Sequence, residues 1–170
     1  KIQQVYDVDY PISVLFEAPT ISACADMLRE VVGDKAQTTT GSDSKQNTPK
    51  SRYTHLVPMH STKSTKLTPF FLVAGMFGNV LNLRHLAQLI GSDRAFYGLQ
   101  ARGLYGDHEP HETFEEMAKD YIKEMKTVQS EGPYILGGFS GGGITAYEIA
   151  RQLIESGEEV AELIFLDTPL

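Results

Sequence analysis

The fold of this chain is decided by residues 134–143, which read YILGGFSGGG. The first part is apolar and rich in residue types that favour a β-strand, and a helical pattern follows the glycines at once. Between the two lies Gly138-x-Ser140-x-Gly142. A strand, a sharp turn and a helix around such a motif predict a nucleophile elbow, with a strained backbone at Ser140 and its side chain above the sheet. The residues two before and two after the serine must be small, because strand and helix pass close together there.

Residues 53–170 alternate between stretches typical of strands and stretches typical of helices. We expect strands at residues 55–60, 69–74, 95–99, 134–139 and 160–166, and helices at residues 80–90, after a cap at Thr113, and at residues 141–155. Pro58 limits the first strand to an edge of the sheet, because proline cannot donate a ladder hydrogen bond. The expected buried face of the middle helix consists of Phe114, Met117, Tyr121 and Met125. The alternation predicts an α/β fold, a mostly parallel sheet with helices on both faces and chemistry at the carboxyl ends of its strands.

The N-terminal part of the chain has a different character. Residues 1–33 are too few to hold a core and are interpreted as the C-terminal helices of a small helical domain. Thr20 is a good N-cap for a helix that we expect to end at Gly33. Residues 34–52 have no aromatic residue and no periodicity, which is typical of a flexible linker. The domain of interest therefore begins at about residue 53.

Composition narrows the classes of function. The chain has 170 residues, a formal net charge of −7 and no basic cluster, which argues against nucleic acid as a partner. No apolar stretch is long enough to span a membrane, so no membrane association is expected. The single cysteine, Cys24, fits the reducing cytoplasm and a buried apolar role. The histidine spacing predicts no metal site, and His108 and His111, on either side of Pro110, are interpreted as a loop pair.

Ser140 needs a base and an acid to act as a nucleophile, because a serine hydroxyl is weakly nucleophilic at neutral pH. On this fold the acid follows the serine, and Asp167 stands at the end of the next predicted strand. Two backbone N–H groups must stabilise the oxyanion, and we expect them from Gly141 and from Met76, in the turn after residues 69–74. All five histidines precede Ser140. A base recruited from among them would break the usual order of serine, acid and histidine.

Several stretches together carry a resemblance to a known family. They are residues 96–104 (FYGLQARGL), 132–142 (GPYILGGFSGG), 146–150 (AYEIA) and 163–167 (LIFLD). They resemble the type I thioesterases, the α/β-hydrolase domains that release products from nonribosomal peptide synthetases and modular polyketide synthases. Residues 15–21 (LFEAPTI) are similar to the end of the carrier protein domain that precedes such a thioesterase. The resemblance covers nearly everything except the linker.

This resemblance implies a role for each matching residue. Ser140 would take an acyl or peptidyl group from a phosphopantetheine thioester, Asp167 would match the family's acid, and residues 74–76 would match the oxyanion turn. Water or an internal nucleophile of the product would then open the acyl-enzyme, giving a linear acid or a macrocycle. The domain would bind no cofactor directly, because its substrate arrives on the 4′-phosphopantetheine of a carrier domain, its partner in cis.

The resemblance also implies parts that these residues do not include. The family's histidine and lid helices would lie beyond Leu170, and the pantetheine-bearing serine of the carrier would lie before Lys1. We therefore expect these 170 residues alone to turn over little substrate, because a serine without its histidine loses several orders of magnitude in rate.

Two other functions fit the same sequence. A free-standing α/β-hydrolase esterase would keep Ser140 and Asp167, would prefer simple esters, and would give residues 1–33 no role. A non-catalytic docking module would keep the hydrolase fold without its base.

Overall fold

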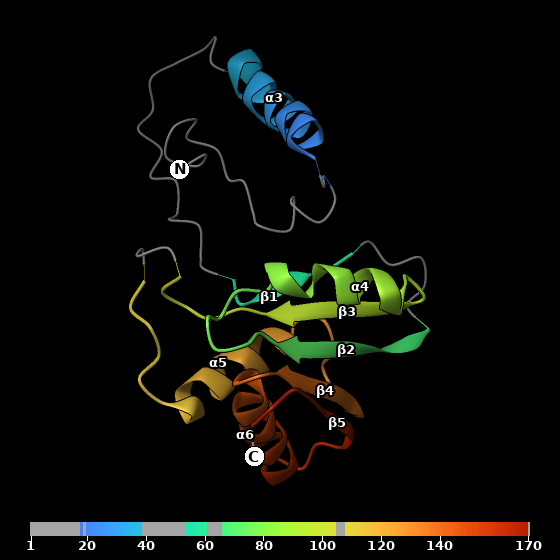
Figure 1. Cartoon of the computed structure of the whole chain (residues 1–170), viewed down its shortest axis with the longest axis vertical. Coiled ribbons are helices and arrows are strands. Elements are labelled where there is room, and N and C mark those ends of the chain that lie inside the picture. The colour runs from blue at the N-terminus through green and yellow to red at the C-terminus, as the bar shows by residue number, and fades with distance from the viewer. Residues whose placement is uncertain (1–17, 19, 39–53, 61–65, 105–107, 170) are drawn as a thin grey trace. The chain divides into compact units, whose positions relative to one another are not determined.

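A computed structural model describes residues 18, 20–38, 54–60, 66–104 and 108–169 (Figure 1). The chain divides into two compact units, Lys1–Arg52 and Tyr53–Leu170. The first unit contains helix α3 (Ile21–Thr38), and the second contains the sheet and the other described helices. None of the described helices combines the length and the apolar character needed to cross a lipid bilayer.

Helix α3 begins as expected and ends later than expected. The hydroxyl oxygen of Thr20 accepts a hydrogen bond of 3.1 Å from the backbone N–H of Ala23, which confirms the predicted N-cap. The prediction that Gly33 ends the helix is wrong, because α3 continues to Thr38 and takes up residues 34–38 of the predicted linker. A single glycine costs a helix only about 1 kcal/mol, and Lys35, Ala36 and Gln37 are good helix formers. The rest of the predicted linker lies outside the described residues.

The second unit is built on a five-stranded sheet. Its strands are β1 (Leu56–Pro58), β2 (Leu67–Val73), β3 (Arg94–Leu99), β4 (Tyr134–Phe139) and β5 (Val160–Leu166), in the order β1-β3-β2-β4-β5. Strand β1 pairs antiparallel with β3, and all the other pairs are parallel. The predicted α/β fold and the edge position of the strand that contains Pro58 are confirmed.

The connecting helices differ from the prediction in two details. They are η1 (Leu81–Leu83, a 3₁₀ turn), α4 (Arg84–Ile90), α5 (Phe114–Met125) and α6 (Gly142–Glu155). The helix expected over residues 80–90 is therefore a 3₁₀ turn that leads into an α-helix. In α5 the predicted cap is confirmed, since Thr113 Oγ1 accepts from the N–H of Glu116 at 3.2 Å. The prediction that Phe114 is buried is wrong: its side chain is 48% exposed, and the buried residues of α5 begin a turn later, at Ala118.

Helices cover both faces of the sheet. Helices α5 and α6 pack on one face, where the core is made of residues such as Phe71, Tyr121, Leu136 and Ile149. On the opposite face lies the segment that leads into η1, since a β carbon on Gly98 of strand β3 would lie 2.9 Å from Val80. Figure 1 shows α4 on this second side, away from α5 and α6. Strand β4 lies between β2 and the edge strand β5, so the turn that follows it opens at the carboxyl edge, one strand in from the end of the sheet.

Candidate active site

Ser140 occupies the turn between strand β4 and helix α6. Its backbone φ is 52°, in the left-handed region that a residue with a β carbon adopts at a cost of about 1–2 kcal/mol. Two backbone hydrogen bonds hold it there, one to the end of β5 and one to the start of α6. The Ser140 N–H donates to the carbonyl of Leu166 at 2.7 Å, and the Ser140 carbonyl accepts from the N–H of Gly143 at 3.1 Å. The strained serine expected from the motif is present.

The glycines of the motif lie where strand and helix approach most closely. A β carbon on Gly138 would lie 2.4 Å from the carbonyl oxygen of Gly142, and one on Gly142 would lie 2.2 Å from that of Ala74. Both contacts are with backbone atoms, which cannot rotate away. The expected close approach around Ser140 is confirmed.

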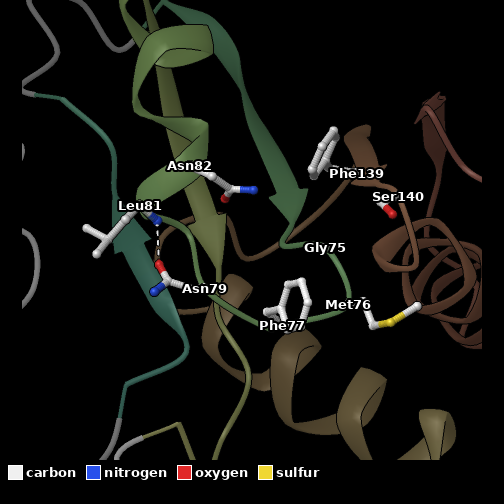
Figure 2. Close-up of a pocket in the computed structure, with 8 residues that line it drawn as sticks. All are labelled: Gly75, Met76, Phe77, Asn79, Leu81, Asn82, Phe139 and Ser140. Atoms are coloured by element: carbon white, nitrogen blue, oxygen red, sulfur yellow. Dashed lines mark hydrogen bonds between the residues drawn. The ribbon is translucent and has the colours of Figure 1, made fainter.

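A pocket of about 500 Å³ opens beside Ser140. Figure 2 shows Ser140 and Phe139 on one side and the segment with Asn79, Leu81 and Asn82 on the other, joined by the turn Gly75–Phe77. None of the described residues that line it is charged. Asn79 turns its side chain back to its own loop, where Oδ1 accepts from the N–H of Leu81 at 2.7 Å (Figure 2). The pocket therefore suits a neutral group with apolar parts.

Met76 and Gly141, expected to supply the oxyanion donors, lie next to each other. A β carbon built on Gly141 would lie 3.7 Å from the backbone nitrogen of Met76. Within the described part of the chain, neither of their N–H groups donates a hydrogen bond. Ser140 also stands at the N-terminal end of the 14-residue helix α6, where the helix dipole favours negative charge.

Asp167 follows the last residue of β5 and has a φ of 53°. It is exposed, and no described side chain hydrogen-bonds its carboxylate. Strand β5 pairs in register with β4, with Leu166 opposite Phe139, so Asp167 and Ser140 leave the sheet at the same edge. No histidine is among the residues that line the pocket with Ser140.

Two histidines for which the sequence predicts no site role, His55 and His111, meet elsewhere in the unit. His111 Nε2 lies 3.1 Å from Asp120 Oδ2, and the rings of His55 and His111 have centroids 5.3 Å apart. His111 lies in the loop before α5, as expected, but its spacing from His108 did not predict its contacts with Asp120 and His55. No local pattern marks this cluster, because His55 precedes β1 whereas His111 precedes α5.

The comparisons with known proteins agree on one family. The family model described as Thioesterase domain matches residues 68–170. A similar protein is the polyketide synthase PksR of Bacillus subtilis, 35% identical over 168 residues, which are 99% of this chain and 6% of that protein. The dimodular nonribosomal peptide synthase of the same organism is 35% identical over 98% of this chain and 6% of its own length. The chain thus spans only a small part of these relatives.

Solved structures give the same result. The NocB thioesterase domain from the nocardicin cluster, in covalent complex with a fluorophosphonate nocardicin G analogue, matches with a TM-score of 0.56 and 33% identity over 60% of this chain and 46% of that chain. The four-domain nonribosomal peptide synthetase AB3403 matches with a TM-score of 0.66 and 25% identity over 99% of this chain and 11% of that chain. The strand–elbow–helix geometry, the pocket at Ser140 and these matches agree: the chain belongs to the thioesterase domain family.

Proposed function

We propose that this chain is part of a product-release thioesterase that takes an acyl or peptidyl group from a phosphopantetheine thioester onto Ser140. The observation that carries the proposal is the strained serine, with φ 52°, at the start of α6 and at the mouth of an uncharged pocket. A left-handed backbone at a residue with a β carbon persists where the surrounding structure holds it in place, and such strain is concentrated at active sites.

The proposed chemistry is a two-step acyl transfer. Ser140 Oγ attacks the thioester carbonyl and gives its proton to a histidine held by Asp167, and the thiol leaves with that proton. The N–H groups of Met76 and Gly141 receive the oxyanion, and their lack of other partners among the described residues supports this role. Water or a nucleophile of the product then opens the ester and regenerates Ser140. This base would be the family's histidine.

The proposed partner is a carrier protein domain in cis. The matches to a polyketide synthase and a nonribosomal peptide synthase extend over 99% and 98% of this chain, so they include residues 1–52 as well as the thioesterase unit. The N-terminal unit, with α3 in it, would be the end of that carrier. The proposed location is the reducing cytoplasm, which fits a chain with a single cysteine.

The experiment uses the longest natural polypeptide that contains these residues. It is incubated with a panel of acyl- and peptidyl-pantetheine thioesters, and the peptide that carries Ser140 is weighed by mass spectrometry. We expect a mass increase equal to the acyl group, together with release of one thiol per acyl group transferred. Ser140→Ala should abolish both, whereas Ser130→Ala, in the exposed loop between α5 and β4, should change neither.

The other outcomes distinguish the alternatives. Acylation that survives Ser140→Ala would overturn the proposal. Faster reaction with simple esters than with pantetheine thioesters would indicate a free-standing esterase. Failure of every thioester and of a fluorophosphonate to label Ser140 would indicate a non-catalytic docking module.

A further inference from the structure

Three segments that lie far apart in the sequence bring His55, His111 and Asp120 together. His55 precedes β1, His111 precedes α5, and Asp120 lies within α5. One imidazole nitrogen from each histidine and one carboxylate oxygen of Asp120 lie within 4.8 Å of one another. None of the three lines the pocket beside Ser140, so the cluster is separate from the proposed active site.

His55 is oriented by a contact of the kind that orients metal ligands. His55 Nδ1 lies 2.9 Å from the backbone carbonyl oxygen of Gln100. A carbonyl can only accept, so Nδ1 carries the hydrogen and the lone pair of the neutral ring is on Nε2. Histidines that bind metals commonly hold their second nitrogen against a backbone carbonyl or a carboxylate in this way. His111 Nε2 lies 3.1 Å from Asp120 Oδ2, close to the separation of two ligands on one tetrahedral ion.

His111 is deeply buried, and its Nε2 atom faces Asp120. Its side chain is only 1% exposed, and its Nδ1 atom has no hydrogen-bond partner within the described residues. Asp120 is the described hydrogen-bond partner of this buried ring, through Nε2. An ion bound by His111 Nε2 and Asp120 Oδ2 would take the place of the proton between them, and Nδ1 would carry the hydrogen of the ring.

We propose that His55, His111 and Asp120 form a binding site for a divalent transition-metal ion, with Zn²⁺ the best match. Two imidazole nitrogens and one carboxylate oxygen suit zinc, whereas Mg²⁺ and Ca²⁺ prefer oxygen ligands alone. Ligands of a tetrahedral zinc ion lie about 3.4 Å from one another. The cluster therefore has to contract slightly, and Asp120, whose side chain is 40% exposed, has room to move. Three protein ligands leave a fourth position for water.

The neighbouring positive charge sets how tightly the ion is held. Arg102 Nη1 lies 3.5 Å from Asp120 Oδ2, and its Nε donates to the carbonyl of Glu109 at 2.7 Å. This guanidinium shares Asp120 with the ion and repels it. We therefore expect an affinity in the micromolar range rather than that of a closed structural zinc site. A bound ion would connect the start of edge strand β1, the segment before α5 and α5 itself.

The test measures metal binding by the 170-residue chain without an affinity tag. Zinc is added to chelator-treated protein in competition with a chromophoric chelator, and Co²⁺ serves as a spectroscopic probe of coordination. We expect one zinc ion per chain and a visible Co²⁺ spectrum of four-coordinate intensity. His111→Gln and Asp120→Asn should each weaken zinc binding at least tenfold. His85→Gln removes an exposed histidine on α4 and should leave binding unchanged.

Circular dichroism of the metal-free variants separates ligand loss from unfolding. Asp120→Asn keeps the size of a half-exposed side chain, so it provides a folded variant if His111→Gln does not fold. The proposal is overturned if the chain binds no zinc at 100 µM, a concentration of about 100 times the expected micromolar Kd. It is also overturned if a folded Asp120→Asn variant binds zinc as tightly as the parent chain.

Discussion

The backbone N–H of Ser140 donates a hydrogen bond of 2.7 Å to the carbonyl oxygen of Leu166, the residue before Asp167. This bond extends the pairing of β4 and β5 by one step beyond the register pair of Phe139 and Leu166. Ser140 and Asp167 then leave the sheet with nearly equal left-handed φ values, 52° and 53°. The position of the proposed nucleophile is therefore fixed by the strand that carries the proposed acid.

Asp167→Asn tests the role of that acid. Asparagine tolerates a left-handed backbone, so the fold should be kept. An amide cannot orient and stabilise a catalytic histidine as a carboxylate does, and we expect kcat to fall by about 10²–10⁴-fold. The measurement is thioester turnover by the longest natural polypeptide that contains these residues. Glu162→Gln, an exposed carboxylate on β5, is the matched control and should keep turnover within about twofold of the parent value. Equal losses in the two variants would contradict a special role for Asp167.

Gly142→Ala tests the close approach behind Ser140. The new methyl group would lie 2.2 Å from the carbonyl oxygen of Ala74, so strand and helix must separate. We expect the free energy of unfolding to fall by about 3 kcal/mol or more. Gly157→Ala is the control, because a β carbon at Gly157 meets nothing within 4 Å and only its φ of 87° is unfavourable. That variant should lose about 1–2 kcal/mol. Urea denaturation followed by circular dichroism measures both, and similar losses would contradict the steric argument.

The elements that sequence predicted best are the ones set by local patterns. Strands β4 and β5 occupy residues 134–139 and 160–166, as expected, because each is an apolar run between polar or glycine-containing turns. The elbow follows from a local pattern too, since Gly138-x-Ser140-x-Gly142 stands directly between an apolar run and a helical pattern. Local sequence patterns therefore suffice to indicate Ser140, Gly141 and Asp167 as candidate site residues.

The features that sequence did not predict depend on contacts between distant segments. Helix α3 continues past Gly33 because helix formers follow the glycine, and a single-residue stop signal is weaker than their sum. Phe114 is in phase with the buried face of α5 but is its first residue, so the periodicity alone did not show that it is exposed. The proximity of His55 to His111 requires β1 to pair with β3 and α5 to pack beneath them, and no spacing along the chain encodes that arrangement.

Met76→Pro tests whether a backbone N–H, and not the side chain, serves the oxyanion. Residues 75–78 form a turn in which the N–H of Gly78 donates to the carbonyl of Gly75 at 2.7 Å, and Met76 is its second residue. Its φ is not positive, so proline, which favours this position of type I and type II turns, should fit. We expect kcat for thioester turnover to fall by about 10²–10³-fold because one oxyanion donor is lost.

Met76→Ala is the matched control for that variant. It keeps the N–H and removes most of a side chain that is 81% exposed, so kcat should change by less than about tenfold. Circular dichroism should show both variants folded. A large loss in Met76→Ala, or none in Met76→Pro, would place the donor elsewhere.

The stability of the chain at alkaline pH should depend on Tyr134. Its side chain is fully buried, and its hydroxyl donates to the carbonyl of Gln129 at 3.0 Å. Burial, and then the charges of Glu158 and Glu131, raises the pKa of Tyr134 to about 12. Between pH 10 and 12 the unfolded chain loses this proton while the folded chain keeps it, so the folded state becomes less stable as pH rises, by up to about 2–3 kcal/mol.

Tyr134→Phe tests this dependence, because it removes the titrating group and leaves the other groups unchanged. The measurement is urea denaturation of both proteins at pH 8 to 12. At pH 8 the parent should be more stable by about 1 kcal/mol, the value of the lost hydrogen bond, and this advantage should shrink and reverse as the pH approaches 12. A difference between the two proteins that stays constant with pH would show that Tyr134 titrates alike in the folded and unfolded chain.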